Sequence, residues 1–168
     1  MTSTLDLANR HYTLYSTGID LSSAKAPSIE DREIYTAAML VCSAADGDLH
    51  EEEEKWIVGH QAAFGVPQSI LDNVQELKTK WTYDEIVVKI KESSTLKFTR
   101  RIFVLHILTA CGADSELAPE EMDSIRGVAS ALDLPEDQFE ELLELYNQQQ
   151  EVNKKLMKCL WKESNPYE

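Results

Sequence analysis

The sequence predicts an all-α protein: a helical bundle of two helix–acidic loop–helix repeats related by a pseudo-two-fold axis. Apolar residues recur at helical intervals along most of the chain, and no stretch alternates apolar and polar residues as a strand does. A shift of 68 positions without a gap places Ile34 on Ile102 and keeps segment 34–71 in register with its second copy. Two copies predict a paired bundle, because a solenoid needs more repeats.

The repeat is centred on an acidic loop, residues 45–54 in the first copy and 113–122 in the second. Identical residues lie within the loop and in the helices on both sides of it. The further identical pairs are Leu40 and Leu108, Ala45 and Ala113, Asp46 and Asp114, Leu49 and Leu117, Glu52 and Glu120, Glu53 and Glu121, Ile57 and Ile125, Gly59 and Gly127, Ala63 and Ala131, and Pro67 and Pro135.

Composition indicates a single soluble domain with an acidic surface. The 168 residues are 43% hydrophobic and 27% charged, and the net charge is −14. Such a surface repels nucleic acid and anionic lipid, so we expect no nucleic-acid partner and instead a protein partner with a basic surface.

The cellular location expected from the sequence is the cytoplasm. Residues 1–10 lack the basic-then-apolar signature of a secretory signal, and no apolar run reaches the roughly 18 residues that span a bilayer. The cysteines Cys42, Cys111 and Cys159 form no CxxC pair. Cys42 and Cys111 lie in apolar helical runs, which is typical of buried, reduced thiols.

The chain divides into an N-terminal segment, 1–27, and one helical domain, 28–168. The segment is expected to be loosely packed or to form one short helix that ends near Gly18, before a loop. The apolar residues of that helix are Leu5, Leu7, Tyr12 and Tyr15, and the loop contains Ser22, Ser23 and Pro27.

The first repeat covers about 30–77. A capping box at Ser28–Asp31 opens a central helix that runs to Ala45, and Gly47 breaks it. The second helix opens near His50 with four glutamates in its first turn, where they favour the helix dipole, and Gly65 ends it. A third helix follows Pro67, with Ile70, Leu71, Val74 and Leu77 inward, and Thr82–Glu85 opens a short connecting helix.

The second repeat covers about 98–145. Its central helix is expected over 98–113, and Pro119 takes the first position of the partner helix. A long helix then opens at Pro135 and reaches about Glu163. Gln148–Gln150 interrupts its apolar stripe, so the extension 146–163 is expected to form a separate helix or to pack less tightly. The central helix carries Ile102, Leu105, Leu108 and Thr109 along one side.

The acidic loops fail the test for an EF-hand. With Gly47 at the sixth loop position, Glu53 takes the twelfth position, where a bidentate carboxylate belongs. The first and third positions are then Cys42 and Ala44, which offer no side-chain oxygen. The second copy has Ala110 and Gly112 there, and Ser115 replaces the glycine.

Two interpretations of the loop acids stay open. Asp46 and Glu53 flank a tight turn, and Asp114 and Glu121 repeat the arrangement. If the repeats pack about a two-fold axis, these four carboxylates converge and offer hard oxygen ligands, which suit calcium or magnesium better than zinc. Alternatively, the same acids only cap helix ends, a role worth about 0.5–2 kcal/mol each.

The sequence does not predict an enzyme. The run that begins at His50 lacks the second histidine of a metalloprotease helix, and neither His60 nor His106 follows a glutamate by three positions as in a di-iron bundle. His106 lies in an apolar helix, which is typical of a hydrogen-bonded core residue. Among Trp56, Trp81 and Trp161, one exposed beside the acids would mark a partner surface.

The acidic loops resemble those of the TerB-like (tellurite resistance protein B) family. Ala45–Leu49 followed by Glu52 and Glu53, and Ala113–Leu117 followed by Glu120 and Glu121, carry the resemblance, which covers about residues 30–145. It implies an all-helical fold with two similar halves and metal binding by the motif acids Asp46, Glu53, Asp114 and Glu121. It also implies a stress-associated role through partner proteins, with peripheral membrane association through such a partner. The alternative function is a metal-free acidic scaffold for protein interaction.

Overall fold

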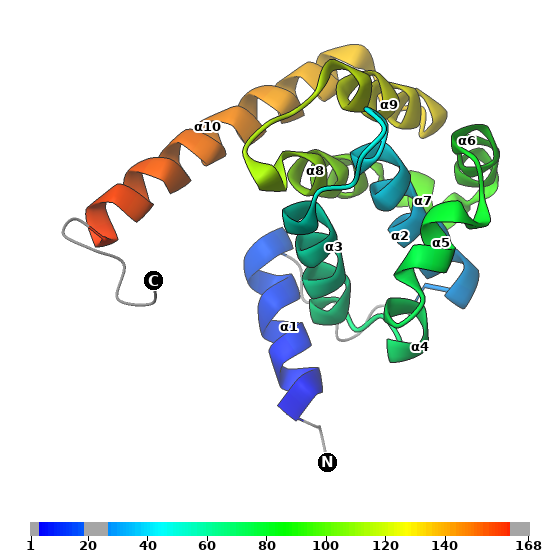
Figure 1. Ribbon diagram of the computed structural model, residues 1–168, viewed down its shortest axis with the longest axis horizontal. Coiled ribbons are helices and arrows are strands. Elements are labelled where there is room, and N and C mark those ends of the chain that lie inside the picture. The colour runs from blue at the N-terminus through cyan, green and yellow to red at the C-terminus, as the bar shows by residue number, and fades with distance from the viewer. Residues whose placement is uncertain (1–3, 19–26, 162–168) are drawn as a thin grey trace.

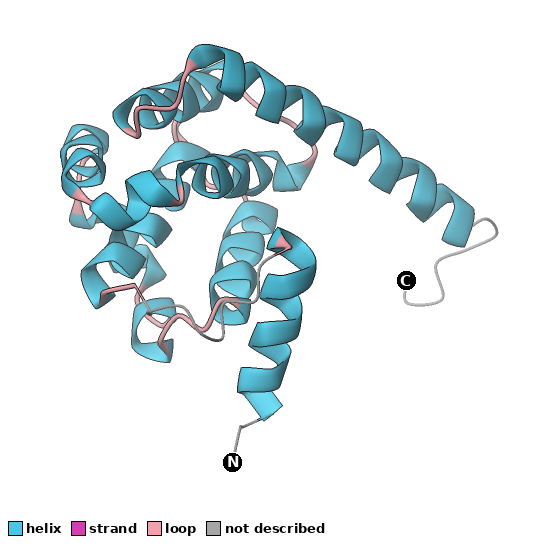
Figure 2. Cartoon of the chain, turned by 180° about the vertical axis from the view of Figure 1, so that it is seen from behind, coloured by secondary structure: helices cyan, strands magenta, loops and turns pink. Residues whose placement is uncertain are grey.

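The protein is built from α-helices (Figures 1 and 2). The computed structural model describes residues 4–18 and 27–161, and within them every regular element is helical. The all-α fold class is therefore confirmed. The helices are α1 Thr4–Thr17, α2 Ile29–Ser43, α3 Glu51–Ala63, α4 Gln68–Leu71, α5 Val74–Lys80, α6 Tyr83–Glu92, α7 Ser94–Phe98, α8 Arg100–Cys111, α9 Pro119–Ala131 and α10 Glu136–Leu160, with a 3-10 turn, η2, at Gly112–Asp114.

The core is organised around α2 and α8, which contact one another and are surrounded by α3, α5, α6, α7, α9 and α10 (Figure 1). Both helices are apolar on most sides, as expected of helices that are covered all round. Their most completely buried apolar residues are Ala37, Ala38, Met39, Leu40, Cys42, Phe103, Val104, Ile107, Leu108, Ala110 and Cys111. The predicted central role of both helices agrees with this packing.

Two details predicted for the second central helix are wrong. It begins at Arg100, after a separate short helix α7, and Phe98 is 91% exposed. Of the four residues predicted along one side, Leu108 is buried but Ile102, Leu105 and Thr109 are only half-buried. Phe103 and Ile107, which the prediction left out, are fully buried. A helix that is apolar on most sides gives no amphipathic contrast, so periodicity could not identify its most buried face.

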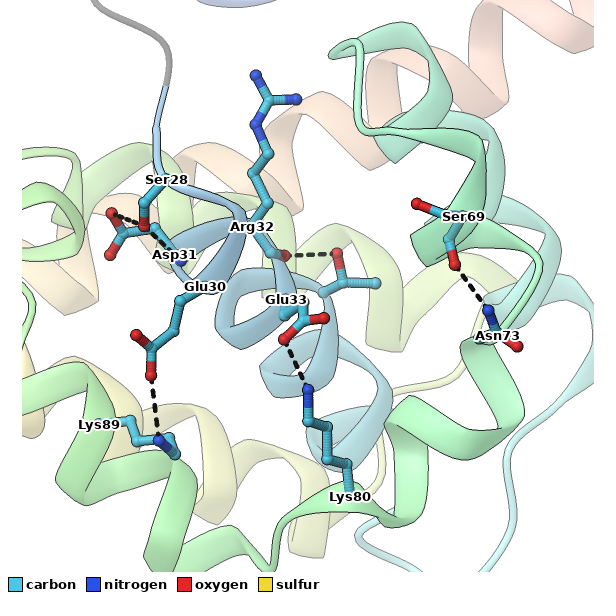
Figure 3. Close-up of polar contacts among 10 residues, drawn as sticks. Ser28, Glu30, Asp31, Arg32, Glu33, Ser69, Asn73, Lys80 and Lys89 are labelled. Carbon is cyan, nitrogen blue, oxygen red and sulfur yellow. Dashed lines mark hydrogen bonds and ion pairs between the residues drawn. The ribbon is translucent and has the colours of Figure 1, made fainter.

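The first turn of α2 is fixed by a cap and by two ion pairs (Figure 3). The Oγ of Ser28 accepts a hydrogen bond of 3.0 Å from the backbone N–H of Asp31, which confirms half of the predicted capping box. The Nζ of Lys80 lies 2.6 Å from a carboxylate oxygen of Glu33, and Lys89 lies 3.3 Å from Glu30. These pairs tie α5 and α6 to the start of the central helix.

The third helix of the first repeat is divided into α4 and α5, which corrects the single helix expected after Pro67. The break lies at Asp72 and Asn73. The side-chain amide of Asn73 donates to the carbonyl oxygen of Ser69 at 2.7 Å (Figure 3), and such local bonds compete with the helical backbone ladder. The apolar residues expected along this segment are nevertheless all buried, namely Ile70, Leu71, Val74 and Leu77.

Helix α10 is continuous through Gln148–Gln150, so of the two alternatives predicted for the extension the separate helix is wrong. Glutamine is a good helix former, and a polar residue ends an apolar stripe without ending a helix. The looser packing expected of the extension is confirmed, because every residue from Glu151 to Trp161 is exposed. In both views this part of α10 extends away from the body of the protein (Figures 1 and 2).

The N-terminal helix α1 lies beside α3 (Figure 1). It ends at Gly18, whose φ of +72° stops the helix, as predicted. The ring of Tyr12 meets that of Phe64 edge-on at 5.7 Å between centroids. The loop predicted at Ser22 and Ser23 lies outside the described residues.

Helices α3 and α9 occupy equivalent positions in the two copies, since Glu51–Ala63 shifted by 68 positions becomes Pro119–Ala131. The pseudo-two-fold axis itself and the division at residue 28 stay predictions. No helix of the described chain is long and apolar enough to cross a bilayer. The cytoplasmic location also stays a prediction.

Candidate carboxylate site

The first acidic loop turns at Gly47. The Oδ1 of Asp46 accepts a hydrogen bond of 3.1 Å from the backbone N–H of Asp48, two residues on. Gly47 between them has a φ of +111°, a conformation that glycine adopts far more easily than other residues. Asp46 therefore holds the turn that directs the chain from α2 into α3.

The second loop makes the same turn without a glycine. The Oδ1 of Asp114 accepts from the backbone N–H of Glu116 at 2.9 Å, and Ser115 takes a left-handed conformation with φ of +79°. The serine at the glycine position thus preserves this hydrogen bond. The left-handed conformation of Ser115 costs about 1–2 kcal/mol of backbone strain, the usual penalty for a residue with a side chain in that conformation.

Glu53 and Glu121 occupy the same position in the first turns of α3 and α9. One carboxylate oxygen of Glu53 accepts the backbone N–H of His50 at 2.8 Å, and Glu121 accepts that of Ala118 at 2.8 Å. Both glutamates therefore cap the helices that carry them. Unlike ordinary caps they are buried, Glu53 completely and Glu121 to within 4% of its surface.

The two buried carboxyl groups interact with each other. Burial raises the pKa of both Glu53 and Glu121 above the ordinary glutamate value, while the backbone N–H bonds act in the opposite direction. The pKa of each glutamate thus depends on the charge of the other, and the pair resists carrying two negative charges at once. The Oε1 of Glu53 is buried and meets no hydrogen-bond partner within bonding distance in the described part of the chain.

The two aspartates add negative charge to the same pair. Asp114 raises the pKa of both glutamates, and Asp46 raises that of Glu121. Acids from both loops therefore act on one another electrostatically. In this arrangement, however, no group of three or more histidine, cysteine, aspartate or glutamate side chains among the described residues is placed to hold a metal ion. Cation binding by Asp46, Glu53, Asp114 and Glu121 stays a prediction.

His50 is a neighbour of these acids that the sequence did not predict. Its Nε2 lies 3.9 Å from the Oδ2 of Asp114, so it approaches the opposite loop. Position 118 of the second copy is an alanine, and the contact therefore has no counterpart there. The position of His50 directly before four glutamates indicated that it lies close to acidic groups. Only the packing of the first loop against the second shows that it approaches Asp114.

The thiols below the acid pair are structural, as expected for Cys42 and Cys111. Both are buried at the ends of the central helices, and Cys111 accepts a contact of 3.5 Å from the hydroxyl of Ser43. Burial, with a further contribution from the charge of Glu121, raises the pKa of Cys42 to about 12. A thiol with so high a pKa is not a reactive nucleophile.

A second polar cluster joins four aromatic side chains away from the carboxylates. The Nε2 of His60 lies 3.0 Å from the Nδ1 of His106. The hydroxyl of Tyr12 lies 3.0 Å from the Nδ1 of His60, and that of Tyr35 lies 2.6 Å from the Nδ1 of His106. Burial lowers the pKa of His60 to about 4 and that of His106 to about 2. His106 is thus a buried, hydrogen-bonded residue, as predicted.

The expected tryptophan marker does not lie beside the acids. Trp56 is partly buried and stacks on His60 at 4.5 Å between ring centroids, and Trp81 packs against the core. Trp161 is 40% exposed but lies at the end of α10. Partner docking beside the carboxylates therefore has no aromatic anchor among these three residues.

Comparison with known proteins adds one structural relative. No family model and no curated protein matches the chain. The crystal structure of a tellurite resistance protein from Nostoc punctiforme is similar, with a TM-score of 0.77 and 24% sequence identity over 99% of this chain and 100% of that one. At this identity the likeness shows the fold. The chain therefore has the fold of a tellurite resistance protein, in agreement with the resemblance that its two acidic loops carry.

Proposed function

We propose that this chain is a TerB-like helical module that binds a divalent cation through its two acidic loops and acts by docking partner proteins. The proposed ligands are Asp46, Glu53, Asp114 and Glu121, and the proposed context is tellurite or another chemical stress. The observation that carries the proposal is the buried Oε1 of Glu53. It has no hydrogen-bond partner among the described residues, while a second buried carboxyl group, that of Glu121, interacts with Glu53.

Such an arrangement is costly without a compensating positive charge. A buried polar atom without a partner costs about 1–3 kcal/mol, and two adjacent carboxyl groups cannot both ionise freely. A protein can offset this cost with a proton, a cationic side chain or a metal ion. Two basic groups lie near the first loop: Lys55 pairs with the exposed Glu51 at 2.6 Å, and the Nε2 of His50 approaches Asp114 rather than the glutamate pair.

The residues present fit a hard divalent cation. Glu53 contributes the unpartnered Oε1, and each aspartate uses Oδ1 in its turn, which leaves Oδ2 as a donor. Carboxylate oxygens without nitrogen or sulfur donors suit calcium or magnesium. A bound divalent ion would supply the positive charge that the pair lacks. Because the donors are not yet gathered around one point, cation binding would draw the two loops together.

A role in tellurite resistance would be indirect. Tellurite is an oxyanion, and a cluster of four acids repels it. We infer that the module is not an enzyme and that it contributes by presenting its surface to a partner. With a net charge of −14, that surface suits a partner with a basic face.

The alternative function is a metal-free acidic scaffold. It is favoured by the hydrogen bonds that Glu53 and Glu121 already make to the first turns of α3 and α9. In that case one proton shared by Glu53 and Glu121 would reduce the repulsion between their carboxylates. The concentration of divalent cations would then not affect the stability of the protein.

Thermal unfolding with and without a chelator separates the two functions. The cation model predicts that excess calcium or magnesium raises the midpoint of the wild-type protein and that a chelator reverses the effect. At a cation concentration one hundred times the Kd, the gain is about 2.7 kcal/mol. Glu121→Gln should lose this response, whereas Glu120→Gln, an exposed neighbour, should keep it. If the unfolding midpoint of the wild-type protein is the same with cation and with chelator, the cation model is wrong and the metal-free scaffold is the function.

A further inference from the structure

The exposed half of α10, from Glu151 to Leu160, carries apolar side chains on the described surface. Every residue of this half is exposed, and several apolar side chains along the helix remain about half exposed. These are Val152, Leu156, Met157 and Leu160, together with Leu145 just before this half. Contiguous apolar surface of this kind marks an interaction site in a folded protein.

The spacing of these residues is that of a two-helix seam. Leu145, Gln149, Val152, Leu156 and Cys159 follow one another at alternating intervals of four and three residues. This is the heptad spacing by which one helix packs along another, with a polar glutamine at its centre. The exposed face therefore suits a helix as its occupant.

The charges along α10 indicate which helix would pack on its exposed face. Its first three turns are acidic, and its exposed half carries three lysines in five residues. Side chains of both kinds, from Asp137 to Lys155, line one shallow surface groove along the helix. The acids of the first turns are Glu136, Asp137, Glu140, Glu141 and Glu144, and the lysines are Lys154, Lys155 and Lys158.

A second copy of the same helix, running in the opposite direction, complements this pattern. Its lysines would lie beside the acids of the first copy, and its acids beside the lysines of the first, with both apolar seams facing inward. A parallel copy would instead place like charges side by side. Anionic lipid is a poorer match, because the three lysines adjoin an acidic helix half and a strongly acidic body.

We propose that two copies of this chain associate through antiparallel packing of their α10 helices, centred near Gln149. The surface is separate from the carboxylate site, and the proposal does not depend on cation binding. A helix of 25 residues is about 37 Å long, so the exposed half of each copy can lie along the acidic half of the other. The association is isologous, as in most homodimers, because each copy offers the same two halves.

Sedimentation equilibrium of the full chain tests the association. The wild type is expected to form a dimer in a concentration-dependent way, and Leu156→Glu, which places a charge on the exposed seam, should weaken it at least about tenfold. Val88→Glu is the matched control, because Val88 is exposed to a similar degree, 54% against 48% for Leu156, but lies on α6. Circular dichroism verifies that both variants remain folded.

Charge reversal tests the antiparallel direction. Lys155→Glu with Lys158→Glu should raise the dimer Kd about tenfold, and the further changes Glu141→Lys and Glu144→Lys should restore it. Thiol crosslinking gives an independent reading. Ten residues separate Gln149 from Cys159, so the two Cys159 thiols of an antiparallel pair lie about 30 Å apart. A crosslinker of about 10 Å should join Gln149→Cys chains in a Cys159→Ser background but should not join wild-type chains.

Three outcomes would overturn the proposal. The first is a monomer at every concentration up to about 100 µM, which is far above a specific dimer constant. The second is efficient crosslinking through Cys159, which would indicate a parallel pair. The third is a monomer that binds phosphatidylserine vesicles through the lysines, which would make the helix a lipid-binding segment.

Discussion

Replacing Glu53 by glutamine tests the physical basis of the carboxylate site. The change keeps the size of the side chain, and its amide oxygen can still accept the backbone N–H of His50. The amide NH₂ takes the place of the proton that the carboxyl pair otherwise shares. The substitution therefore removes one charge from a buried pair while the helix keeps a capping oxygen.

The direction of the effect depends on pH. Because the pKa of Glu53 is raised in the folded protein, its favourable contribution is complete below the ordinary glutamate pKa and is lost as the pH rises through the raised value. Without cations, the wild type should thus lose stability in alkaline buffer. Glu53→Gln has no such proton to lose, so its stability should depend less on pH.

The size of the effect follows from the burial of the pair. Glu53 is fully buried. Ionising it beside the carboxylate of Glu121 therefore costs about 2 kcal/mol, which is within the range for an uncompensated buried polar group. For a chain of this length that corresponds to a change of about 4–8 °C in Tm. In chelator at pH 8.5, Glu53→Gln should unfold that much higher than wild type, and near pH 5 most of the difference should vanish.

The assay is thermal unfolding by circular dichroism at the two pH values, in chelator. Glu52→Gln is the matched control, because it removes one carboxylate from the same helical turn at an exposed position. Its pH dependence should equal that of wild type. If Glu53→Gln is less stable than wild type by the same amount at both pH values, the carboxylate acts only as a charged helix cap and the reasoning from pair repulsion is wrong.

The remaining predictions concern the loops and the core. Ser115→Gly should stabilise the protein by about 1 kcal/mol and Gly47→Ala should destabilise it by a similar amount, because both positions have positive φ. Urea unfolding measures both changes. A destabilising Ser115→Gly together with a stabilising Gly47→Ala would contradict the inferred backbone strain. The pKa values of His60 and His106 are lowered to about 4 and about 2. The contribution of the two neutral imidazoles to stability is therefore complete above the ordinary histidine pKa and is lost as the pH falls toward the lowered values. In NMR titration neither ring should therefore protonate above about pH 5, and an ordinary midpoint near 6.5 would refute the buried assignment. Gly112→Ala should destabilise the protein by about 1–3 kcal/mol, since the added Cβ would collide with the Tyr146 hydroxyl. Tyr146→Phe should recover part of that loss in a double-mutant cycle. Additive losses would show that the two residues do not collide.

The sequence was sufficient for the fold class and for the position of the acidic turns. Repetition and helical periodicity are local signals, and Gly47 and Pro119 mark their helix boundaries through backbone geometry alone. The face that α8 buries was not predictable in the same way. Its residues are apolar on nearly all sides, and only contact with α2 and the surrounding helices selects Phe103 and Ile107 over Ile102 and Leu105.

The chemistry of the site was predictable only in part. The capping bonds of Glu53 and Glu121 follow from their place in the first turn of a helix, which a sequence reveals. Their complete burial and their effect on each other depend on how α3 and α9 meet across the fold. The approach of His50 to Asp114 likewise joins residues that are far apart along the chain and has no counterpart in the second repeat.

The most direct test of the central claim is a calorimetric titration of calcium and of magnesium into chelator-stripped protein. Wild type should be compared with the double variant Asp46→Asn and Asp114→Asn, which removes one proposed ligand from each loop and keeps the turn-forming oxygens. Micromolar binding by wild type that is lost in the double variant is the predicted result. An absence of binding heat in both proteins, with the variant merely less stable, would contradict a cation site and leave the four acids as helix caps.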